Sequence, residues 1–501
     1  MKRASGILMP VFSLPGPWGI GTLGEEARRF VEFLAAAGQT YWQILPVGPT
    51  GYGDSPYQSF SVFAGNPYLI APGILIAQGL LKAEEAPVDW GGASDRIDYG
   101  VLYARRHTML QKAAERIPVT DSAFSQWRTA QNTWLEDYAL FMALKEENRQ
   151  RSWIFWPDEV RLRRPAALSA ARQRLASRVD YWQKVQYLFH NQWMELLAYA
   201  HQKGVQIIGD LPIYAAPDSA DLWAQPELFQ TDNDRRLTRV AGCPPDAFAA
   251  EGQLWGNPLY DWPYHKATGY AWWLRRLRHA LTICDVVRID HFRGFESYYS
   301  IPATDTTARN GSWQPGPGMD FIGAIRATLP DARIISEDLG YLTPQVKKLL
   351  EQSGYPGMKV LQFAFDRREA GDYLPHNYLR NSVVYTGTHD NTTTAAWETE
   401  AHPEDVARAR AYLHTGNEPL VEGFIRAAMA SVSDIAIIPM QDWLGLGAEA
   451  RMNVPSCPQG NWRWRVEQSA LTPRLARRIA DLTELYGRCA GKSFHCSPKA
   501  P

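Results

Sequence analysis

Three short apolar segments of this chain each end in a carboxylate, and these three acids are the residues best placed for catalysis. The acids are Asp290, Glu337 and Asp390, at the ends of segments 285–290, 332–337 and 382–390. An acid at the end of a buried strand contributes little to the core, whereas the carboxyl-end face of a (β/α)8 barrel carries the chemistry of that fold. We therefore expect the three acids to share a site, as nucleophile, proton donor and transition-state partner.

The neighbours of these acids suggest how the roles divide. Arg288 lies two residues before Asp290, so on a strand both side chains point the same way. A guanidinium lowers the pKa of a neighbouring carboxyl and keeps it ionised, as a nucleophile requires. Glu337 is left as the general acid, which needs a raised pKa, and His389 beside Asp390 could donate a hydrogen bond to a substrate hydroxyl. These are the parts of a retaining glycosidase, whose two carboxyl groups lie about 5 to 5.5 Å apart.

Each acid taken alone also has a plain structural interpretation. A loop carboxylate commonly caps a helix or pairs with Lys or Arg. Asp338, next to Glu337, is best explained in that way, because strand alternation sends its side chain to the opposite side, and we interpret it as a helix cap. Three acids in register at strand ends make the plain interpretation of Asp290, Glu337 and Asp390 much weaker.

Helices followed by buried strands recur along the chain, which indicates a mainly parallel sheet. A helix at about 180–203 precedes a strand at 205–210. A helix with Thr343 as its N-cap and Pro344 in its first turn precedes a strand at 358–365. At least six such strands favour an α/β fold, either a (β/α)8 barrel or a doubly wound sheet. Dinucleotide and Walker phosphate-binding motifs are absent from the sequence, which lowers the nucleotide-binding alternative.

Two stretches depart from the simple helix–strand rhythm. We expect one elaborated (β/α)8 catalytic domain over residues 1–501, with a largely helical insertion at about 72–200. A second insertion at about 215–270 is rich in Gly, Pro and Trp and is expected to be loop-like. Long structured loops at a barrel mouth are usually functional, so the second insertion is predicted to form a lid over the active site.

Composition narrows the class of ligand. The formal net charge is -1 in 501 residues, so no basic surface for nucleic acid or an acidic membrane is expected, and the substrate is predicted to be uncharged. Five cysteines, an odd number without metal-ligand spacing, argue against a disulfide framework and a zinc site and fit a cytoplasmic protein. Residues 231–234 lack the Gly and closing Glu of a calcium loop. We expect no metal, no other cofactor and no membrane span.

The segments around the three acids resemble the catalytic blocks of a known family. Residues 288–294, 336–340 and 387–391 are similar to those of the 4-alpha-glucanotransferases, also called amylomaltases or disproportionating enzymes. Further segments that resemble family motifs are 53–58, 65–68, 252–258, 357–363, 439–442 and 460–462. The resemblance extends over nearly the whole chain.

This resemblance implies an α-amylase-clan (β/α)8 barrel with inserted subdomains and no cofactor. It implies that Asp290 is the nucleophile, Glu337 the general acid/base and Asp390 the transition-state stabiliser. The substrate-binding residues that it implies are Tyr57, Asp210, Phe248, Gln253, Trp255, Arg288, His389 and Asn461. The implied reaction moves an α-1,4-glucan segment from a malto-oligosaccharide, or from a starch-derived or glycogen-derived glucan, to the 4-hydroxyl of another glucan or of glucose.

Transfer and hydrolysis share this chemistry, so an α-amylase-like α-1,4-glucan hydrolase is the alternative function. A transferase must exclude water and hold an acceptor, which the lid at 244–258 would do. The family carries an aromatic pair where this chain has Ala247 and Phe248, so we expect an altered acceptor or ring-size preference. A catalytically silent glucan-binding protein would have lost at least one acid, and all three are present.

Overall fold

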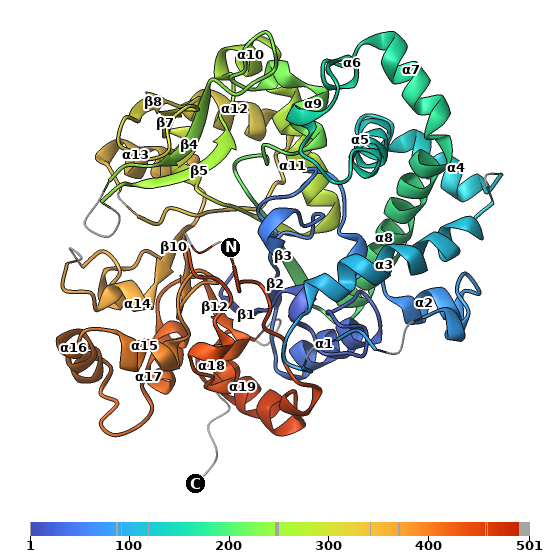
Figure 1. Cartoon of the computed structure of the whole chain (residues 1–501). Coiled ribbons are helices and arrows are strands. Elements are labelled where there is room, and N and C mark those ends of the chain that lie inside the picture. Colours follow the sequence, from blue (N-terminus) through green and yellow to red (C-terminus); the bar gives the residue numbers. More distant parts are fainter. Residues whose placement is uncertain are drawn as a thin grey trace.

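Eight parallel strands close into a barrel in the order β1, β12, β11, β10, β9, β6, β3, β2 (Figure 1). The computed structural model describes residues 2–86, 89–91, 93–118, 120–245, 250–340, 342–368, 371–455, 457 and 459–489. The barrel strands are β1 (Ala4–Leu8), β2 (Tyr41–Gln43), β3 (Gln206–Leu211), β6 (Val286–Ile289), β9 (Ile334–Ser336), β10 (Gly357–Val360), β11 (Ser382–Tyr385) and β12 (Ile435–Pro439). The predicted (β/α)8 barrel is confirmed.

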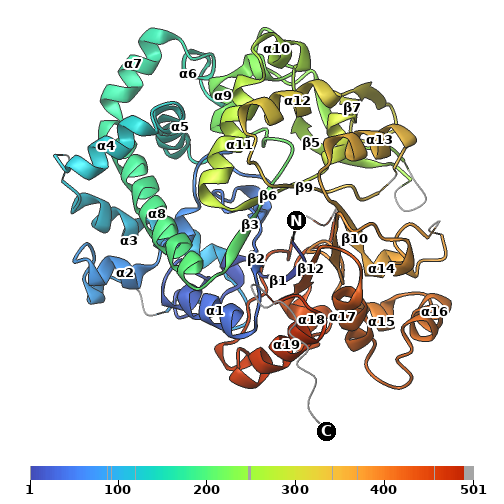
Figure 2. The same ribbon diagram turned by 180° about the vertical axis from the view of Figure 1, so that it is seen from behind.

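Helices cover the outside of the barrel, as the two opposite views show (Figures 1 and 2). They include α1 (Glu25–Ala36), α8 (Ala176–Gln202), α11 (Ala271–Ile283), α12 (Gly318–Thr328), α13 (Pro344–Ser353), α17 (Leu420–Ala430) and α19 (Pro473–Leu485). The predicted cap of α13 is confirmed, since the Thr343 hydroxyl accepts a hydrogen bond from the backbone N–H of Val346 at 3.3 Å. The shorter helices α14 (Leu361–Ala364), α15 (Thr394–Glu400) and α18 (Met440–Leu444) follow β10, β11 and β12, and α16 (Pro403–Leu413) lies between α15 and α17 in the chain.

The strand predicted at 358–365 is shorter than expected. It ends at Val360 as β10, and α14 follows directly. A short apolar run does not distinguish a buried strand from a buried helix, because both lack a polar face. The change of element matters for the site, since it turns the Gln362 amide to donate hydrogen bonds to the Thr392 carbonyl and the Thr394 hydroxyl.

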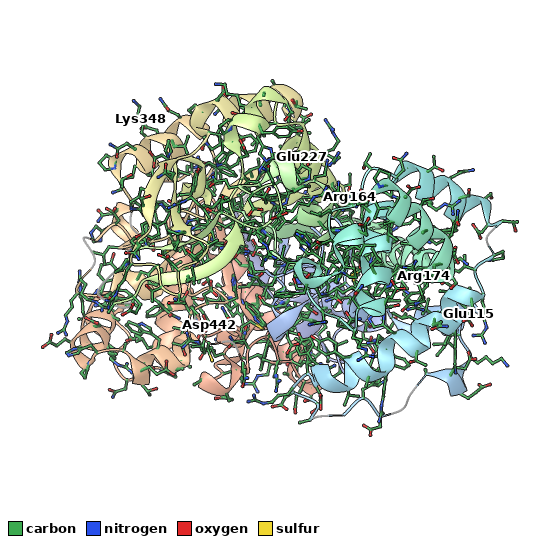
Figure 3. The ribbon with its side chains drawn as sticks, turned by 45° about the horizontal axis from the view of Figure 1, so that its top comes forward. Glu115, Arg164, Arg174, Glu227, Lys348 and Asp442 are labelled. Atoms are coloured by element: carbon green, nitrogen blue, oxygen red, sulfur yellow. The ribbon has the colours of Figure 1, made fainter. Side chains whose placement is uncertain are left out.

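A group of helices lies beside the barrel between β2 and β3 in the chain (Figure 1). It contains α2 (Pro72–Ala77), α3 (Tyr99–Glu115), α4 (Ser122–Ala130), α5 (Leu135–Glu147), α6 (Asp158–Arg161) and α7 (Pro165–Arg174). The range 72–200 also includes most of α8, which packs against β3 and α1 and belongs to the barrel itself. Figure 3 labels Glu115, Arg164 and Arg174 among the side chains of this group. Within the described ranges, no helix is long and apolar enough to cross a membrane.

The stretch 215–270 is not a loop throughout, so that prediction was wrong in part. It contains α9 (Ala220–Ala224), β4 (Arg239–Cys243), β5 (Gln253–Pro258) and α10 (Trp262–Ala267). The two strands join β7 (Ser297–Pro302) and β8 (Ser312–Pro315) in a four-stranded antiparallel sheet ordered β5-β4-β7-β8. Gly and Pro are uncommon within strands, so β4 and β5 are hard to recognise in the sequence. A Cβ on Gly242 would lie 2.1 Å from the Gln253 carbonyl oxygen, so only glycine fits this pairing.

Two arginines join the chain ends at the base of the barrel. Arg488 is fully buried, and its guanidinium donates hydrogen bonds to the carbonyls of Ala4 at 2.9 Å and Met429 at 2.8 Å. Arg3 donates to the Met429 carbonyl at 3.0 Å and the Ser431 carbonyl at 2.8 Å. Burial lowers the pKa of Arg488 to about 9. These bonds satisfy carbonyls at the end of α17 and fix β1 beside β12.

Replacing Arg488 should therefore destabilise the fold. We expect Arg488→Met to lower the free energy of unfolding by about 3 kcal/mol, because several buried carbonyls lose a charged donor. Arg477→Met on α19 is the matched control; Arg477 is 81% exposed in its pair with Asp481, so about 0.5 kcal/mol or less is expected. Urea unfolding followed by circular dichroism measures both, and equal stabilities would contradict the proposed role of Arg488.

Candidate active site

A cavity of about 720 Å³ opens at the carboxyl ends of the barrel strands. The predicted site residues that line it are Tyr57, Gln253, Trp255, Asp290, Glu337, His389, Asp390 and Asn461. Strand register explains how Asp290 and Glu337 meet: Ile289 pairs with Ser336 across β6 and β9, and each acid is the next residue. The Glu337 N–H donates to the Ile289 carbonyl at 3.0 Å, which keeps the two chains together to that point.

Asp210 and Arg288 lie beneath the floor of this cavity rather than on its wall. The Asp210 side chain is fully buried and accepts two hydrogen bonds from Arg288 Nη1, at 2.6 and 2.8 Å. Arg288 Nη2 reaches Asp290 Oδ1 at 3.0 Å, and the Tyr57 hydroxyl donates to Asp210 Oδ2 at 2.7 Å. Asp210 therefore orients Tyr57 and Arg288 from below. Asp210 does not line this cavity, so no contact supports the sugar-binding role implied for it.

The expectation that Arg288 keeps the pKa of Asp290 low was wrong in its net effect. Burial raises the pKa of Asp290 to about 6; the Arg288 charge opposes this, while Asp210 and Asp390 add to it. Burial is therefore the larger effect on Asp290, and Arg288 also gives two hydrogen bonds to Asp210. Asp290 is 28% exposed at its side chain and so faces the cavity.

Glu337 has the raised pKa expected of a general acid. Burial and the charge of Asp290 raise its pKa to about 7, against the opposing effect of Arg288 and of two backbone donors. Those donors are the N–H groups of His291, at 2.6 Å from Oε2, and Leu339, at 2.8 Å from Oε1. They hold both carboxyl oxygens in place.

Asp338 lies outside this group. Its Oδ1 accepts a hydrogen bond from the Met358 N–H at 2.6 Å, so its carboxyl anchors the edge of β10. We expected a helix cap, and the structure shows a strand anchor instead. Burial raises the pKa of Asp338 to about 6 as well, which shows that a raised pKa alone does not identify a catalytic acid.

Asp390 reaches the cavity from the loop after β11. Its Oδ2 lies 3.3 Å from His389 Nε2, and its Oδ1 accepts a hydrogen bond from Asn453 Nδ2 at 2.6 Å. Burial would raise the pKa of Asp390, but His389, Asn453 and the Arg288 charge outweigh it and lower the pKa. Burial likewise tends to lower the pKa of His389, and the Asp390 charge and hydrogen bond raise it overall. In this structure His389 therefore pairs with Asp390.

Aromatic rings form part of the cavity wall. The Tyr57 ring is stacked on His389 at 5.2 Å between centroids, with 19° between planes, and Trp462 lies 5.7 Å away. On the opposite side Trp255 packs edge-on to His291 at 4.9 Å, and its Nε1 donates to Gln253 Oε1 at 3.0 Å. Phe248 and Ala247 lie outside the described residues, so their predicted roles in the lid stay predictions.

Asn461 lines the cavity, but its polar atoms serve its own loop. Its Oδ1 accepts a hydrogen bond from the Val454 N–H at 3.0 Å, and its Nδ2 donates to the Cys457 carbonyl at 2.8 Å. The sequence reasoning missed Asn453 and His291 as wall residues. His291 sits within a motif that resembles the family, whereas Asn453 follows no strand, and only the fold brings it to Asp390.

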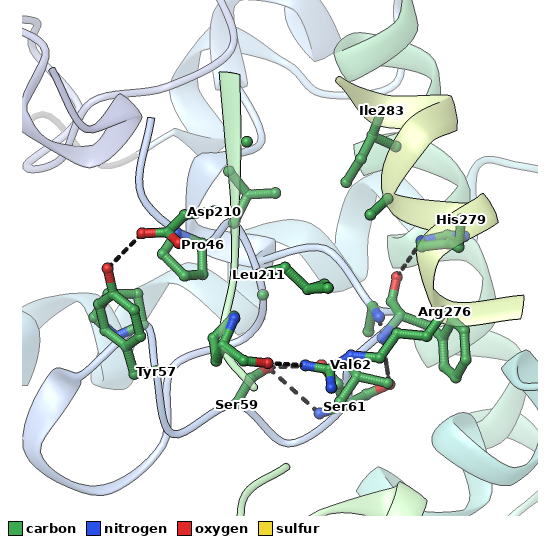
Figure 4. A pocket seen from close by; sticks show the side chains of 18 of the residues that line it. Pro46, Tyr57, Ser59, Ser61, Val62, Asp210, Leu211, Arg276, His279 and Ile283 are labelled. Carbon is green, nitrogen blue, oxygen red and sulfur yellow. Dashed lines mark hydrogen bonds between the residues drawn. The ribbon is translucent and has the colours of Figure 1, made fainter. Parts of the chain in front are cut away.

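A second cavity of about 90 Å³ lies behind Tyr57 and Asp210 (Figure 4). It is lined mainly by apolar side chains, with His279 and Arg276 of α11 at its far side. Since a water molecule takes about 30 Å³, it has room for about three waters and not for a sugar ring. Within the described part of the chain, no cluster of three His, Cys, Asp or Glu side chains could hold a metal ion.

Comparisons with known proteins agree on one family. A family model described as 4-alpha-glucanotransferase matches residues 9–471. The 4-alpha-glucanotransferase of Streptococcus pneumoniae serotype 4 is 47% identical over 494 residues, which cover 97% of this chain and 98% of that protein. That of Thermus thermophilus is 46% identical over 501 residues, covering 97% and 99%.

A solved structure with the same architecture supports the assignment. Amylomaltase from Streptococcus agalactiae, in complex with acarbose, has a TM-score of 0.95 and 40% identity, covering 97% of this chain and 100% of that one. With the family model matching most of the sequence and relatives covered almost end to end, the chain belongs to the 4-alpha-glucanotransferase family.

Proposed function

We propose that this chain transfers α-1,4-glucan segments from a donor malto-oligosaccharide to the 4-hydroxyl of an acceptor glucan or glucose, through two retaining displacements. The observation that carries the proposal is the pair of carboxyl groups, Asp290 and Glu337, that end adjacent barrel strands in one open cavity. Membership of the 4-alpha-glucanotransferase family supports transfer over the alternative, α-1,4-glucan hydrolysis.

In the first displacement Asp290 is the nucleophile. Its ionised carboxylate attacks the anomeric carbon of the donor while Glu337 gives its proton to the glycosidic oxygen, which leaves with the departing chain. A glycosyl ester on Asp290 results. In the second displacement Glu337 takes the proton of the acceptor 4-hydroxyl, whose oxygen attacks the same carbon and releases Asp290 as a carboxylate. Two inversions retain the configuration.

The charge of Asp290 explains how Glu337 can act first as an acid and then as a base. That charge is the largest effect after burial in raising the pKa of Glu337 to about 7. When Asp290 becomes a neutral ester the repulsion disappears, so the pKa of Glu337 falls and its carboxylate form is favoured. The same residue therefore changes role at the point where the reaction needs the change.

Asp390 and the floor residues support the reacting pair. The lowered pKa of Asp390 keeps it ionised, so it can accept hydrogen bonds from sugar hydroxyls and stabilise positive charge at the anomeric carbon. Arg288 and Asp210 fix the position of Asp290 and Tyr57. Tyr57 would contact the sugar with the part of its ring that His389 does not cover.

Acceptor selection is assigned to the walls of the cavity. Gln253 and Trp255 on β5 line one side, and they are proposed to contact the acceptor glucan. A sugar bound there would displace water from the glycosyl ester and present its 4-hydroxyl in its place. Phe248, which lies outside the described residues, stays a predicted acceptor contact, and Asn461 is proposed to keep its own loop in shape. Maltodextrins from starch or glycogen as substrates, and a cytoplasmic location, stay predictions.

Incubation with maltotriose alone tests the proposed function. We expect maltotetraose and longer oligomers to appear together with glucose and maltose, because each transfer lengthens one chain as it shortens another. Asp290→Asn should abolish turnover while maltotriose still binds, since the amide keeps the shape and removes the nucleophile. Chromatography of the products decides the matter: shorter sugars without longer ones would identify a hydrolase.

The activity should depend on pH through the carboxyl pair. Transfer needs Asp290 ionised and Glu337 protonated, so we expect kcat/KM to fall below about pH 6 and again above about pH 7. The acid limb reports protonation of the nucleophile and the basic limb reports loss of the donated proton.

Asp338→Asn is the matched control for this pH profile, since Asp338 is a buried acid with a pKa raised to about 6 that contacts β10 instead of the cavity. The Asp338→Asn variant should keep both the acid and the basic limb of the kcat/KM profile. A profile that stays flat from pH 5 to 8 in the native enzyme would contradict the assignment of the two carboxyl groups.

A further inference from the structure

We propose that Asn453 is a positioning residue that holds the carboxylate of Asp390 in its working orientation. The inference rests on the proposed role of Asp390 in the reaction. Asp390 lies five residues beyond the end of β11, and its side chain is 48% exposed in the cavity. A carboxylate on a loop needs other groups to fix its orientation, and Asn453 Nδ2 donates to its Oδ1 at 2.6 Å.

The backbone below Asp390 is already fixed by a different set of contacts. Asp442, labelled in Figure 3, is buried and accepts hydrogen bonds from the Thr394 N–H at 2.8 Å and the Thr386 hydroxyl at 2.5 Å. Asn391 Oδ1 accepts from the Thr388 N–H at 2.9 Å. These bonds hold the loop but do not touch the Asp390 carboxylate, whose orientation is left to His389 and Asn453.

Asn453 is itself held rigidly relative to Asp390. Arg451 Nη2 donates to the Asp390 carbonyl at 3.1 Å, and Arg451 Nε donates to the Asn453 carbonyl at 2.9 Å. The Arg451 guanidinium therefore links the main chain of Asp390 to the main chain of Asn453. Because a guanidinium donates through a fixed fork, this link sets the spacing between the two loops.

The loop that carries Asn453 is anchored at its other end too. The Trp462 N–H donates to the Met452 carbonyl at 2.8 Å, and the Tyr99 hydroxyl donates to the Trp462 carbonyl at 3.0 Å. The Asn461 side chain closes the turn between them through Val454 and Cys457. Asn453 thus projects from a braced loop, which suits a positioning role.

An amide is well suited to this position. It donates to Oδ1 without carrying a charge, so it favours the ionised form of Asp390 and leaves the second lone pair of that oxygen for a sugar hydroxyl. The charged and titratable groups around Asp390 are His389 on its own loop, Arg288 and Asp290 from β6, Arg451 on the neighbouring loop, and Tyr57. Asn453 is the neutral donor that completes this set.

Two substitutions test the proposal with maltotriose as the substrate. We expect Asn453→Ala to lower kcat by about ten- to a hundredfold with a smaller change in KM, since a charge-assisted hydrogen bond that orients the acid is lost. Asn453→Asp should lose more activity at neutral pH, where two carboxylates face each other. Its activity relative to the native enzyme should rise as the pH falls, because the introduced carboxyl group, once protonated, can donate to Asp390 again.

Asn381→Ala is the matched control, an exposed amide that donates to the Gly354 carbonyl at 3.1 Å, on the segment that leads into β11. It should keep native kcat and a native pH profile. Thermal unfolding is measured for every variant, and the near-isosteric Asn453→Asp keeps the test usable should Asn453→Ala not fold. Full activity of folded Asn453→Ala, or no relative gain of Asn453→Asp at low pH, would overturn the proposal.

The readout separates this proposal from the proposed function. Total consumption of maltotriose reports Asp390-dependent chemistry in either a transferase or a hydrolase, whereas the appearance of longer oligomers reports transfer. A native enzyme that only shortens maltotriose would overturn the function, and the Asn453 variants would still be compared by consumption. A native enzyme that lengthens maltotriose while folded Asn453→Ala matches it would overturn only the positioning role.

Discussion

The site depends on one buried cation, Arg288, that is divided among more negative charge than it can neutralise. Its guanidinium forms ion pairs with Asp210 on β3 and with Asp290 at the end of β6. Its charge also tends to lower the pKa of Glu337 and of Asp390. Arg288 lowers the pKa of Asp290, but burial is the larger effect. Burial and the charge of neighbouring carboxylates outweigh the Arg288 charge, and they raise the pKa of Asp290 to about 6 and that of Glu337 to about 7.

Because this neutralisation is incomplete, the charge of Asp290 affects the pKa of Glu337. Each carboxyl is sensitive to the charge of the other, so chemistry at Asp290 is felt as a change in proton affinity at Glu337. Asp390 adds a constant charge, since His389 and Asn453 lower its pKa, and that charge also raises the pKa of Asp290. The barrel thus supplies two coupled acids and one constant charge from three residues of nearly the same type.

How much of this could be predicted from the sequence follows from the range of each interaction. Asp290 and Glu337 could be placed because both depend on local strand patterns, and parallel strands bring their carboxyl ends together. The pKa of Asp290 was mispredicted, since it depends first on burial in the folded site and then on charges such as that of Asp210 on β3, which lies 78 residues from Arg288 in sequence. Asn453 was missed for the same reason, being 63 residues from Asp390 and on no regular element.

The missed strands have the same origin and bear on the choice between transfer and hydrolysis. β4 is bonded on one side to β5 and on the other to β7, so its pairing depends on chain that lies well beyond the glycine-rich stretch where a loop was expected. The resulting sheet supplies a wall in which Trp255 packs against His291, and Asn453 lines the same cavity. The acids serve water and sugar acceptors alike. A rigid wall favours the acceptor that fills it, because a sugar ring loses little further freedom there while water gains no comparable contact. We therefore propose that the selectivity of the reaction depends on these walls, and that the three carboxylates set only its chemistry.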